Sequence, residues 1–140
     1  MKVFFDTNVY IAEALLGEGA ARIIHATKRA RWRSYTSRYV LDEVARVLVD
    51  ALGVSRAFAQ ATRDRIRRHC AIVKDVPSRH EVPEDPKDSA ILAAAVTAGV
   101  NWLVTNDRHL LSLDPYESVR IVSMDGFTTI LQDHGLLPND

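Results

Sequence analysis

The 140-residue chain has a single cysteine, Cys70, so it cannot form an intramolecular disulfide. A chain without disulfides suits a reducing compartment, and we expect a cytoplasmic protein. Long hydrophobic runs are also lacking, because the longest, from Ala90 to Val96, is far shorter than the roughly 20 residues that cross a bilayer. Asp6 comes too early for the apolar core of a signal peptide. These absences predict a protein that is neither exported nor embedded in a membrane.

Net charge is lacking too, since 18 Lys/Arg balance 18 Asp/Glu, but the two signs are unevenly distributed. Residues 20–80 hold 14 Lys/Arg and 5 Asp/Glu, a net charge of +9, whereas residues 81–140 hold 3 and 10, a net charge of −7. A basic region can attract a polyanion while a separate acidic pocket holds a divalent cation. The arginines from Arg63 to Arg68 are equally explained as the solvated face of a helix. Charge alone leaves both interpretations open.

Short apolar runs alternate with longer segments of helical periodicity along the chain. The short runs predict strands at 3–5, 35–36, 72–73, 102–104 and 120–122. The periodic segments predict helices at 8–16, 20–31, 38–52, 55–70 and 85–99, a short helix around 110–111 and a last one at about 125–133. This alternation predicts one domain, residues 1–140, built as a three-layer α/β/α sandwich with a mainly parallel central sheet of four to five strands.

Aspartates follow two of the predicted strands. Asp6 ends the strand at 3–5, and Asp107 follows the strand at 102–104. Open parallel sheets bind ligands at the carboxyl ends of their strands, where the strand order reverses. A partly buried carboxylate is unfavourable there without a cation or hydrogen-bond donors. Taken singly, either aspartate is also explained as the cap of the helix that follows it.

Two further acids lie on predicted helices. Asp88 falls in the first turn of the helix at 85–99, where the helix dipole favours an acid whatever its function. Glu43 lies about 110° from the centre of the apolar stripe of the helix at 38–52, whereas Asp42 lies about 150° away on the other side. Glu43 is therefore closer to the border of the buried face and can lean into a cleft, while Asp42 is better explained as a solvated charge.

Convergence of these four acids would require a counter-ion, because like charges repel one another. Hard divalent cations prefer oxygen ligands, so the expected cofactor is Mg²⁺ or Mn²⁺. Neither histidine nor cysteine occurs near these acids with the spacing of a zinc site.

Four segments resemble the motifs of the PIN-domain nucleases, and more narrowly of the VapC-like toxins of toxin–antitoxin pairs. They are VFFDTNV at 3–9, Glu43 after the second predicted strand, DSAILAAA at 88–95 and LVTNDRHLL at 103–111. Their order and spacing match together over nearly the whole chain. Residues 55–82 carry no such motif, and the resemblance gives no role to Asp85. For Asp125 we expect a cap of the last helix.

The resemblance implies a Mg²⁺- or Mn²⁺-dependent endoribonuclease, the toxin of a type II toxin–antitoxin system. The implied metal ligands and catalytic residues are Asp6, Glu43, Asp88 and Asp107, with Asn8, Thr105 and Asn106 in supporting positions. RNA as substrate, a homodimer and a cognate antitoxin are implied as well. Basic residues between Arg22 and Arg38 are candidates for phosphate contacts, and Trp32 either stacks on a base or packs in the core.

Other functions remain open at this point. A housekeeping RNA-processing nuclease and a catalytically idle module that binds RNA or a partner would use the same PIN-like fold. A phosphatase of the haloacid dehalogenase type wants a second aspartate two residues after Asp6, where this chain has Asn8. A phosphotransfer receiver domain wants adjacent acids after its first strand and a late lysine, whereas Asp6 is alone and the last lysine is Lys87.

Overall fold

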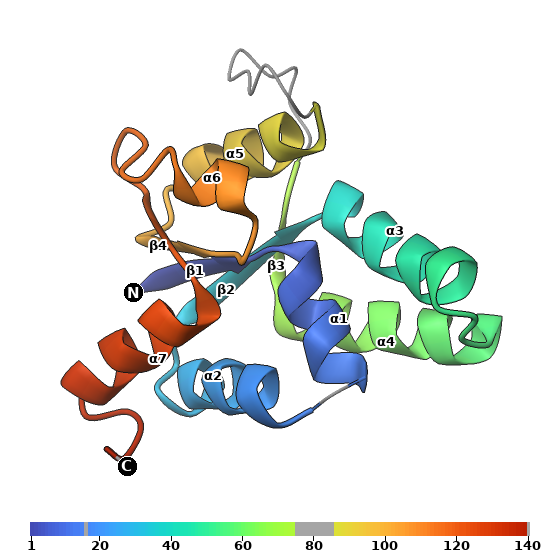
Figure 1. Cartoon of the computed structure of the whole chain (residues 1–140), viewed down its shortest axis with the longest axis horizontal. Helices are drawn as coiled ribbons and strands as arrows, with labels where there is room; N and C mark the ends of the chain where they lie inside the picture. The colour runs from blue at the N-terminus through green and yellow to red at the C-terminus, as the bar shows by residue number, and fades with distance from the viewer. Residues whose placement is uncertain (16, 75–85, 140) are drawn as a thin grey trace.

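A central sheet of five parallel strands organises the structure, a computed structural model that describes residues 1–15, 17–74 and 86–139 (Figure 1). The strands are β1 (Lys2–Phe5), β2 (Arg33–Ser37), β3 (Ala71–Val73), β4 (Trp102–Val104) and β5 (Arg120–Val122). Their order in the sheet is β3-β2-β1-β4-β5. The chain builds outward from β1 to β3 and then crosses back to β4, so the strand order reverses between β1 and β4. The predicted parallel sheet of four to five strands is confirmed.

The two central strands carry the most apolar sequence because both faces of the sheet are covered there. Phe4 of β1 pairs with Leu103 of β4, and Phe5 pairs with Val104, and all four side chains are buried. The pairing continues one residue further, because the backbone N–H of Asp6 donates to the carbonyl of Val104 at 3.0 Å. The end of β1 is thus fixed to the end of β4.

Helices cover both faces of the sheet, which gives the predicted three layers (Figure 1). One face carries α5 (Pro86–Ala98) and α6 (Arg108–Leu111). The other carries α1 (Thr7–Leu15), α2 (Glu18–Arg29), α4 (Arg56–His69) and α7 (Met124–Asp133), and α3 (Arg38–Arg46) packs against α1 and α4. This division follows from handedness, because right-handed crossovers that run in opposite directions along a sheet place their helices on opposite faces.

The third helix begins and ends where its sequence predicts, but its last turn is wider than an α-helical turn. The side chain of Ser37 caps it by accepting a hydrogen bond from the backbone N–H of Val40. Its last turn widens into a π-helical segment, η1 (Val47–Ala51), and the N–H of Leu52 bonds to the carbonyl of Val47 at 3.2 Å. Gly53 follows with a positive φ of 67°, which ends the helix where the sequence predicts.

The expected cap of the last helix is wrong. Helix α7 is capped by Ser123, whose hydroxyl accepts a hydrogen bond from the backbone N–H of Gly126 at 3.0 Å. Asp125 lies inside the first turn and is exposed, where a negative charge suits the helix dipole. Ser123 and Asp125 are both residue types that favour the cap position. Ser123 takes this position because it directly follows β5, which ends at Val122.

Trp32 is partly buried and packs against the core. Its indole contacts Phe127 and His134 edge-to-face, with ring centroids 6.1 and 5.5 Å apart. The packing interpretation of Trp32 is the correct one.

Arg33 begins β2 and therefore lies at the amino edge of the sheet, away from the acids at the carboxyl edge.

No helix in the described part of the chain is long and apolar enough to span a bilayer. Asp85 and most of the polar segment before it lie outside the described residues.

Truncating Leu103 to alanine tests the central pairing, because this buried side chain fills the core beside Phe4. We expect Leu103→Ala to lower the free energy of unfolding by about 2–5 kcal/mol. Leu52→Ala is the matched control, since Leu52 is exposed and should change that free energy by less than about 0.5 kcal/mol. Urea denaturation of both variants measures the difference, and equal losses would contradict this packing.

Candidate active site

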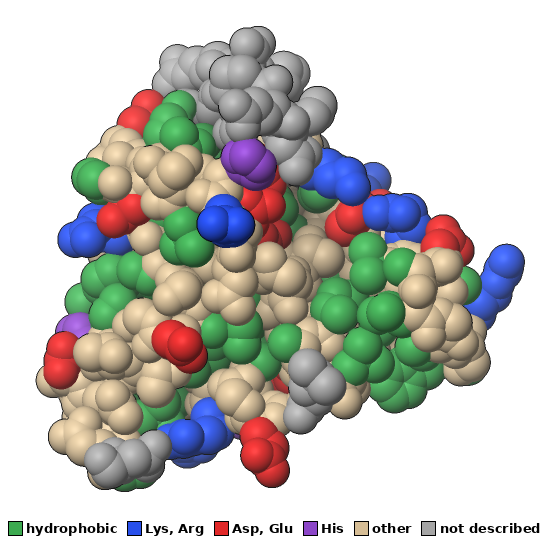
Figure 2. Space-filling model, in the orientation of Figure 1, with side chains coloured by type: hydrophobic (Ala, Val, Ile, Leu, Met, Phe, Trp, Pro, Cys, Tyr) green, Lys and Arg blue, Asp and Glu red, His purple; other side chains and the backbone are tan. Residues whose placement is uncertain are grey.

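A cavity of about 360 Å³ opens at the carboxyl ends of β1 and β4, where the strand order reverses. Figure 2 shows acidic side chains gathered in the hollow between α3 and the α5–α6 pair. The four predicted acids all line this cavity, although they come from four separate segments. Its complete lining is Asp6, Thr7, Asn8, Ile11, Tyr39, Glu43, Val47, Lys87, Asp88, Ile91 and Asp107.

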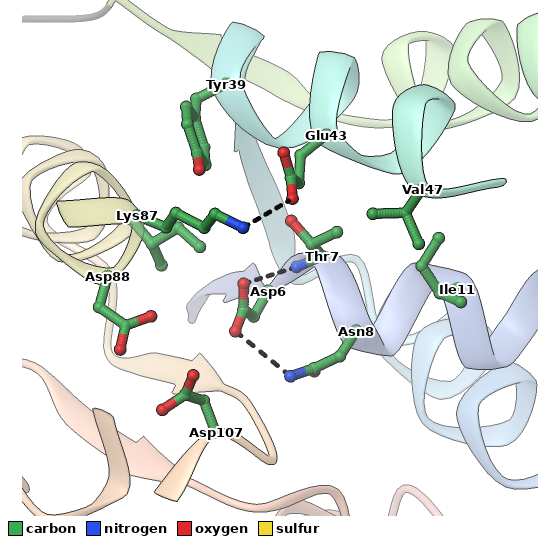
Figure 3. A pocket seen from close by; sticks show the side chains of 11 residues that line it. Asp6, Thr7, Asn8, Ile11, Tyr39, Glu43, Val47, Lys87, Asp88 and Asp107 are labelled. Atoms are coloured by element: carbon green, nitrogen blue, oxygen red, sulfur yellow. Dashed lines mark hydrogen bonds and ion pairs between the residues drawn. The ribbon is translucent and has the colours of Figure 1, made fainter. Parts of the chain in front are cut away.

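Asp6 lies at the bottom of the cavity with only 4% of its surface exposed. Its Oδ1 accepts a hydrogen bond from the backbone N–H of Thr7 at 2.6 Å, and its Oδ2 accepts one from the hydroxyl of Thr105 at 2.7 Å. The amide of Asn8 also donates to Oδ2, at 3.5 Å (Figure 3). A buried carboxylate needs such donors. The structure therefore places Asn8 and Thr105 against Asp6, in the supporting positions expected of them.

Thr105 joins the two strand ends through one hydroxyl. The fully buried Oγ1 donates to Asp6 and accepts a hydrogen bond from the backbone N–H of Asp107 at 2.9 Å. Asp107 in turn caps α6, because its Oδ1 accepts from the N–H groups of His109 and Leu110 at 2.8 and 3.2 Å. Asp107 thus has the structural role of a cap and a place in the cavity at the same time.

Within the described residues, Asn106 makes no hydrogen bond to the four acids, although we expected it to support them, and it does not line the cavity. Its Oδ1 accepts a hydrogen bond from the backbone N–H of Met124 at 3.0 Å, at the start of α7. Alternate residues after a strand point to opposite sides, so Thr105 faces Asp6 while Asn106 faces α7. The side chain of Asn106 therefore fixes the loop after β4 to the beginning of the last helix.

Asp88 reaches the same cavity from the first turn of α5, and only 3% of it is exposed. Figure 3 shows the carboxylates of Asp6, Asp88 and Asp107 directed toward a common space. Burial of two carboxylates beside a third is unfavourable unless positive charge compensates them. The three aspartates form the most concentrated negative charge of the cavity.

Glu43 enters the cavity from α3 and is engaged by two cations. Arg46, one turn later on the same helix, donates from Nε to Oε2 at 3.2 Å and from Nη2 to Oε1 at 2.6 Å. The hydrogen bond to Glu43 and the attraction of its charge raise the pKa of the Arg46 guanidinium. The ammonium of Lys87 lies 3.8 Å from Oε1 (Figure 3).

The helical angles of Glu43 and Asp42 are confirmed by their exposure. The side chain of Glu43 is 15% exposed, whereas that of Asp42 is 61% exposed and pairs with Arg63 at 3.0 Å. Periodicity therefore identified which of two adjacent acids borders the buried face. It gave no indication of the pairing with Arg46, although side chains three residues apart on a helix are neighbours.

The donor set of the cavity fits a hard divalent cation, but the ligands do not yet converge. Only oxygen donors surround the aspartates, which suits Mg²⁺ or Mn²⁺. The hydroxyl of Thr7 is buried beside them without a hydrogen-bond partner among the described residues. Within the same residues, no three Asp, Glu, His or Cys side chains are close enough to hold one ion as they stand. Mg²⁺ is commonly held by one or two carboxylates and several water molecules, which the cavity can accommodate.

Comparison with known proteins adds the following findings. A family model described as PIN domain matches residues 2–109. No curated protein matches the sequence. Among solved structures, VapBC2 from Rickettsia felis bound to a DNA fragment from their promoter matches with 14% identity and a TM-score of 0.68, over 88% of this chain and 98% of that one.

Two further solved structures have similar folds. PAE2754 from Pyrobaculum aerophilum is 18% identical with a TM-score of 0.67, over 95% of this chain and 90% of that one. VapC20 from Mycobacterium tuberculosis, described as a toxin that cleaves the sarcin-ricin loop, is 18% identical with a TM-score of 0.61, over 84% of this chain and 98% of that one. At these identities the likeness extends to the fold alone.

Replacing Thr105 tests the hydroxyl link between Asp6 and the backbone of Asp107. Thr105→Val keeps the shape of the side chain but removes a close donor to the buried Asp6 carboxylate and the acceptor of the Asp107 N–H, so we expect a loss of about 1.5–3 kcal/mol in the free energy of unfolding. Thr105→Ser keeps the hydroxyl and should lose clearly less. Urea denaturation at neutral pH measures both variants, and a valine variant as stable as the serine variant would refute the link.

Proposed function

The chain belongs to the PIN domain family, and from that premise we propose that it is a metal-dependent endoribonuclease, the toxin of a toxin–antitoxin pair. One observation carries the proposal: acids from four separate segments line a single cavity at the reversal of the strand order. Such an arrangement does not stabilise the fold, because like charges in one pocket repel each other. A cluster of this kind is suited to binding divalent cations beside a phosphodiester.

The residues proposed to hold the ions are Asp6, Asp88 and Asp107, and Glu43 completes the cluster from α3. Bound Mg²⁺ or Mn²⁺ would supply a water of lowered pKa and stabilise charge on the attacking and leaving oxygens of a phosphodiester. The protein's own contribution is orientation. Thr105 and the N–H of Thr7 hold Asp6, and the capping bonds of α6 hold Asp107, so these carboxylates are fixed before any ligand arrives.

RNA as the substrate and a toxin's role are supported by the relatives. VapC20, which shares the fold over most of this chain, is described as a toxin that cleaves the sarcin-ricin loop. VapBC2 is a complex bound to promoter DNA, which supports a cognate antitoxin as the partner of this chain. We propose the same pairing here, together with a homodimeric state.

Metal-dependent cleavage is the direct test of the active site. Purified protein incubated with a panel of RNAs and Mn²⁺ should cleave, and excess EDTA should abolish cleavage. Asp6→Asn should lower the rate by about 100-fold or more, because it removes a charge that is held in place by surrounding donors. Product formation is followed by denaturing gel electrophoresis.

The matched control for this assay is Asp42→Asn, which removes one exposed carboxylate next to Glu43 without touching the cavity. It should cleave at the rate of the unmodified protein. Cleavage that survives both EDTA and Asp6→Asn would refute the metal–carboxylate site. Failure of the unmodified protein to cleave any RNA would favour an idle binding module.

Growth arrest tests the toxin assignment separately from the chemistry. Induced expression of the chain in a bacterial host should stop growth, because a toxin that cleaves cellular RNA acts without its antitoxin. Asp6→Asn should abolish the arrest, and Asp42→Asn should preserve it. Growth curves and immunoblots of the expressed protein measure both effects. Unimpaired growth at equal expression, with RNA cleavage intact in vitro, would favour a housekeeping nuclease.

A further inference from the structure

Lys87 introduces positive charge into an otherwise acidic cavity. Among the described residues that line it, four carry a carboxylate and Lys87 alone carries a cation. Lys87 directly precedes Asp88 in the first turn of α5. Asp88 is buried in the cavity wall, and this burial fixes the position of the adjacent backbone from which the Lys87 side chain extends. The ammonium therefore lies at the mouth of the cavity as a consequence of the fold.

Lys87 and Arg46 both approach Glu43. The Nζ of Lys87 lies 3.8 Å from Glu43 Oε1, and Arg46 binds the same oxygen at 2.6 Å. Arg46 makes two hydrogen bonds to Glu43 and so holds this carboxylate from the side of α3. The Lys87 side chain is 59% exposed, so a ligand that enters the cavity from solvent can reach its ammonium.

We propose that Lys87 binds a non-bridging oxygen of the phosphodiester that the enzyme cleaves, and that Glu43, held by Arg46, positions the ammonium. The inference rests on the proposed function. An ammonium offers three N–H donors, so contact with Glu43 leaves it able to donate to a phosphate oxygen as well. Arg46 fixes Glu43 from the side of α3, which keeps Lys87 over the cavity instead of along the helix surface.

Charge balance supports a phosphate as the occupant. Four carboxylates and one ammonium give the lining a formal charge of −3, and Arg46, which pairs with Glu43, brings the charge of the site to −2, which repels a phosphodiester. Two divalent cations would bring this charge to +2, opposite to the −1 of a phosphodiester. Without Lys87 the charge of the loaded site would be +1. Lys87 therefore supplies half of the excess positive charge that attracts the RNA backbone.

The experiment compares Lys87→Met, Lys87→Arg and the control Arg120→Met in RNA cleavage with Mn²⁺. Arg120 is 56% exposed at the start of β5, pairs with Asp114 and does not line the cavity, so its variant removes a surface cation elsewhere. We expect Lys87→Met to lower kcat/KM about 10-fold or more, as for a lost charge-assisted hydrogen bond to substrate. Lys87→Arg, which keeps the charge, should stay much closer to the unmodified protein.

The salt dependence of cleavage distinguishes a phosphate contact from a structural role. Removing one phosphate contact to single-stranded RNA should reduce the slope of log kcat/KM against log salt concentration by about 0.7. Arg120→Met should leave kcat/KM near that of the unmodified protein. Isothermal titration calorimetry with Mn²⁺ alone provides a second readout. If Lys87 were only a counter-ion of Glu43, it would compete with the metal, and Lys87→Met would bind Mn²⁺ more tightly.

The outcomes are separable. Reduced kcat/KM with a smaller salt slope in Lys87→Met, and recovery in Lys87→Arg, support the phosphate contact. Unchanged kcat/KM and slope, or tighter Mn²⁺ binding as the only effect, overturn it while the ribonuclease proposal stands. If the unmodified protein cleaves no RNA, the proposed function and this inference fall together. Urea denaturation confirms that each variant is folded, which the exposure of Lys87 favours.

Discussion

The candidate site depends on the parallel pairing of β1 with β4 in the middle of the sheet. That pairing sets Phe5 opposite Val104 and extends to the backbone hydrogen bond between Asp6 and Val104. Thr105 follows directly, and its hydroxyl can therefore reach Asp6 across the two strand ends. Residues almost one hundred positions apart in sequence thus meet without any flexible element between them. A slip of one residue in this register would turn Thr105 away from Asp6 and dismantle the site.

The accumulation of negative charge is tolerated because each acid has its own compensation. Asp6 has hydrogen-bond donors, Asp107 has the N–H groups at the start of α6, and Glu43 has Arg46. Asp88 lies in the first turn of α5, where the helix dipole favours a negative charge. The helix N termini and the strand ends meet at this edge because the sheet is parallel. The same architecture that allows the acids to be buried also directs them toward one cavity.

The sequence predicts the elements and the acids well because both leave a strong one-dimensional signal. Buried parallel strands must be apolar on both faces, and an acid that ends such a strand is conspicuous, as Asp6 is. The sequence does not predict which of two nearby side chains forms a given hydrogen bond when both are able to form it. Ser123, not Asp125, caps α7, and Asn106 bonds to α7 and not to a carboxylate. The π-helical turn after α3 has the same apolar pattern as an α-helix, so periodicity cannot distinguish them. Each of these outcomes depends on side chains that only the folded chain brings near.

Capping and ligand binding are not competing explanations of these acids. Asp107 uses Oδ1 for both capping bonds, and these bonds fix the orientation of its carboxylate, while Asp107 also lines the cavity. A cap is therefore a means of orienting a carboxylate with backbone groups that cannot move. Glu43 differs, because the group that fixes it is the half-exposed side chain of Arg46. Backbone donors hold a carboxylate more rigidly than a long side chain does, since a long side chain retains rotamer freedom. The aspartates from the strand ends are accordingly the most rigidly held part of the cluster, and Glu43, which is held by the Arg46 side chain, is held less rigidly.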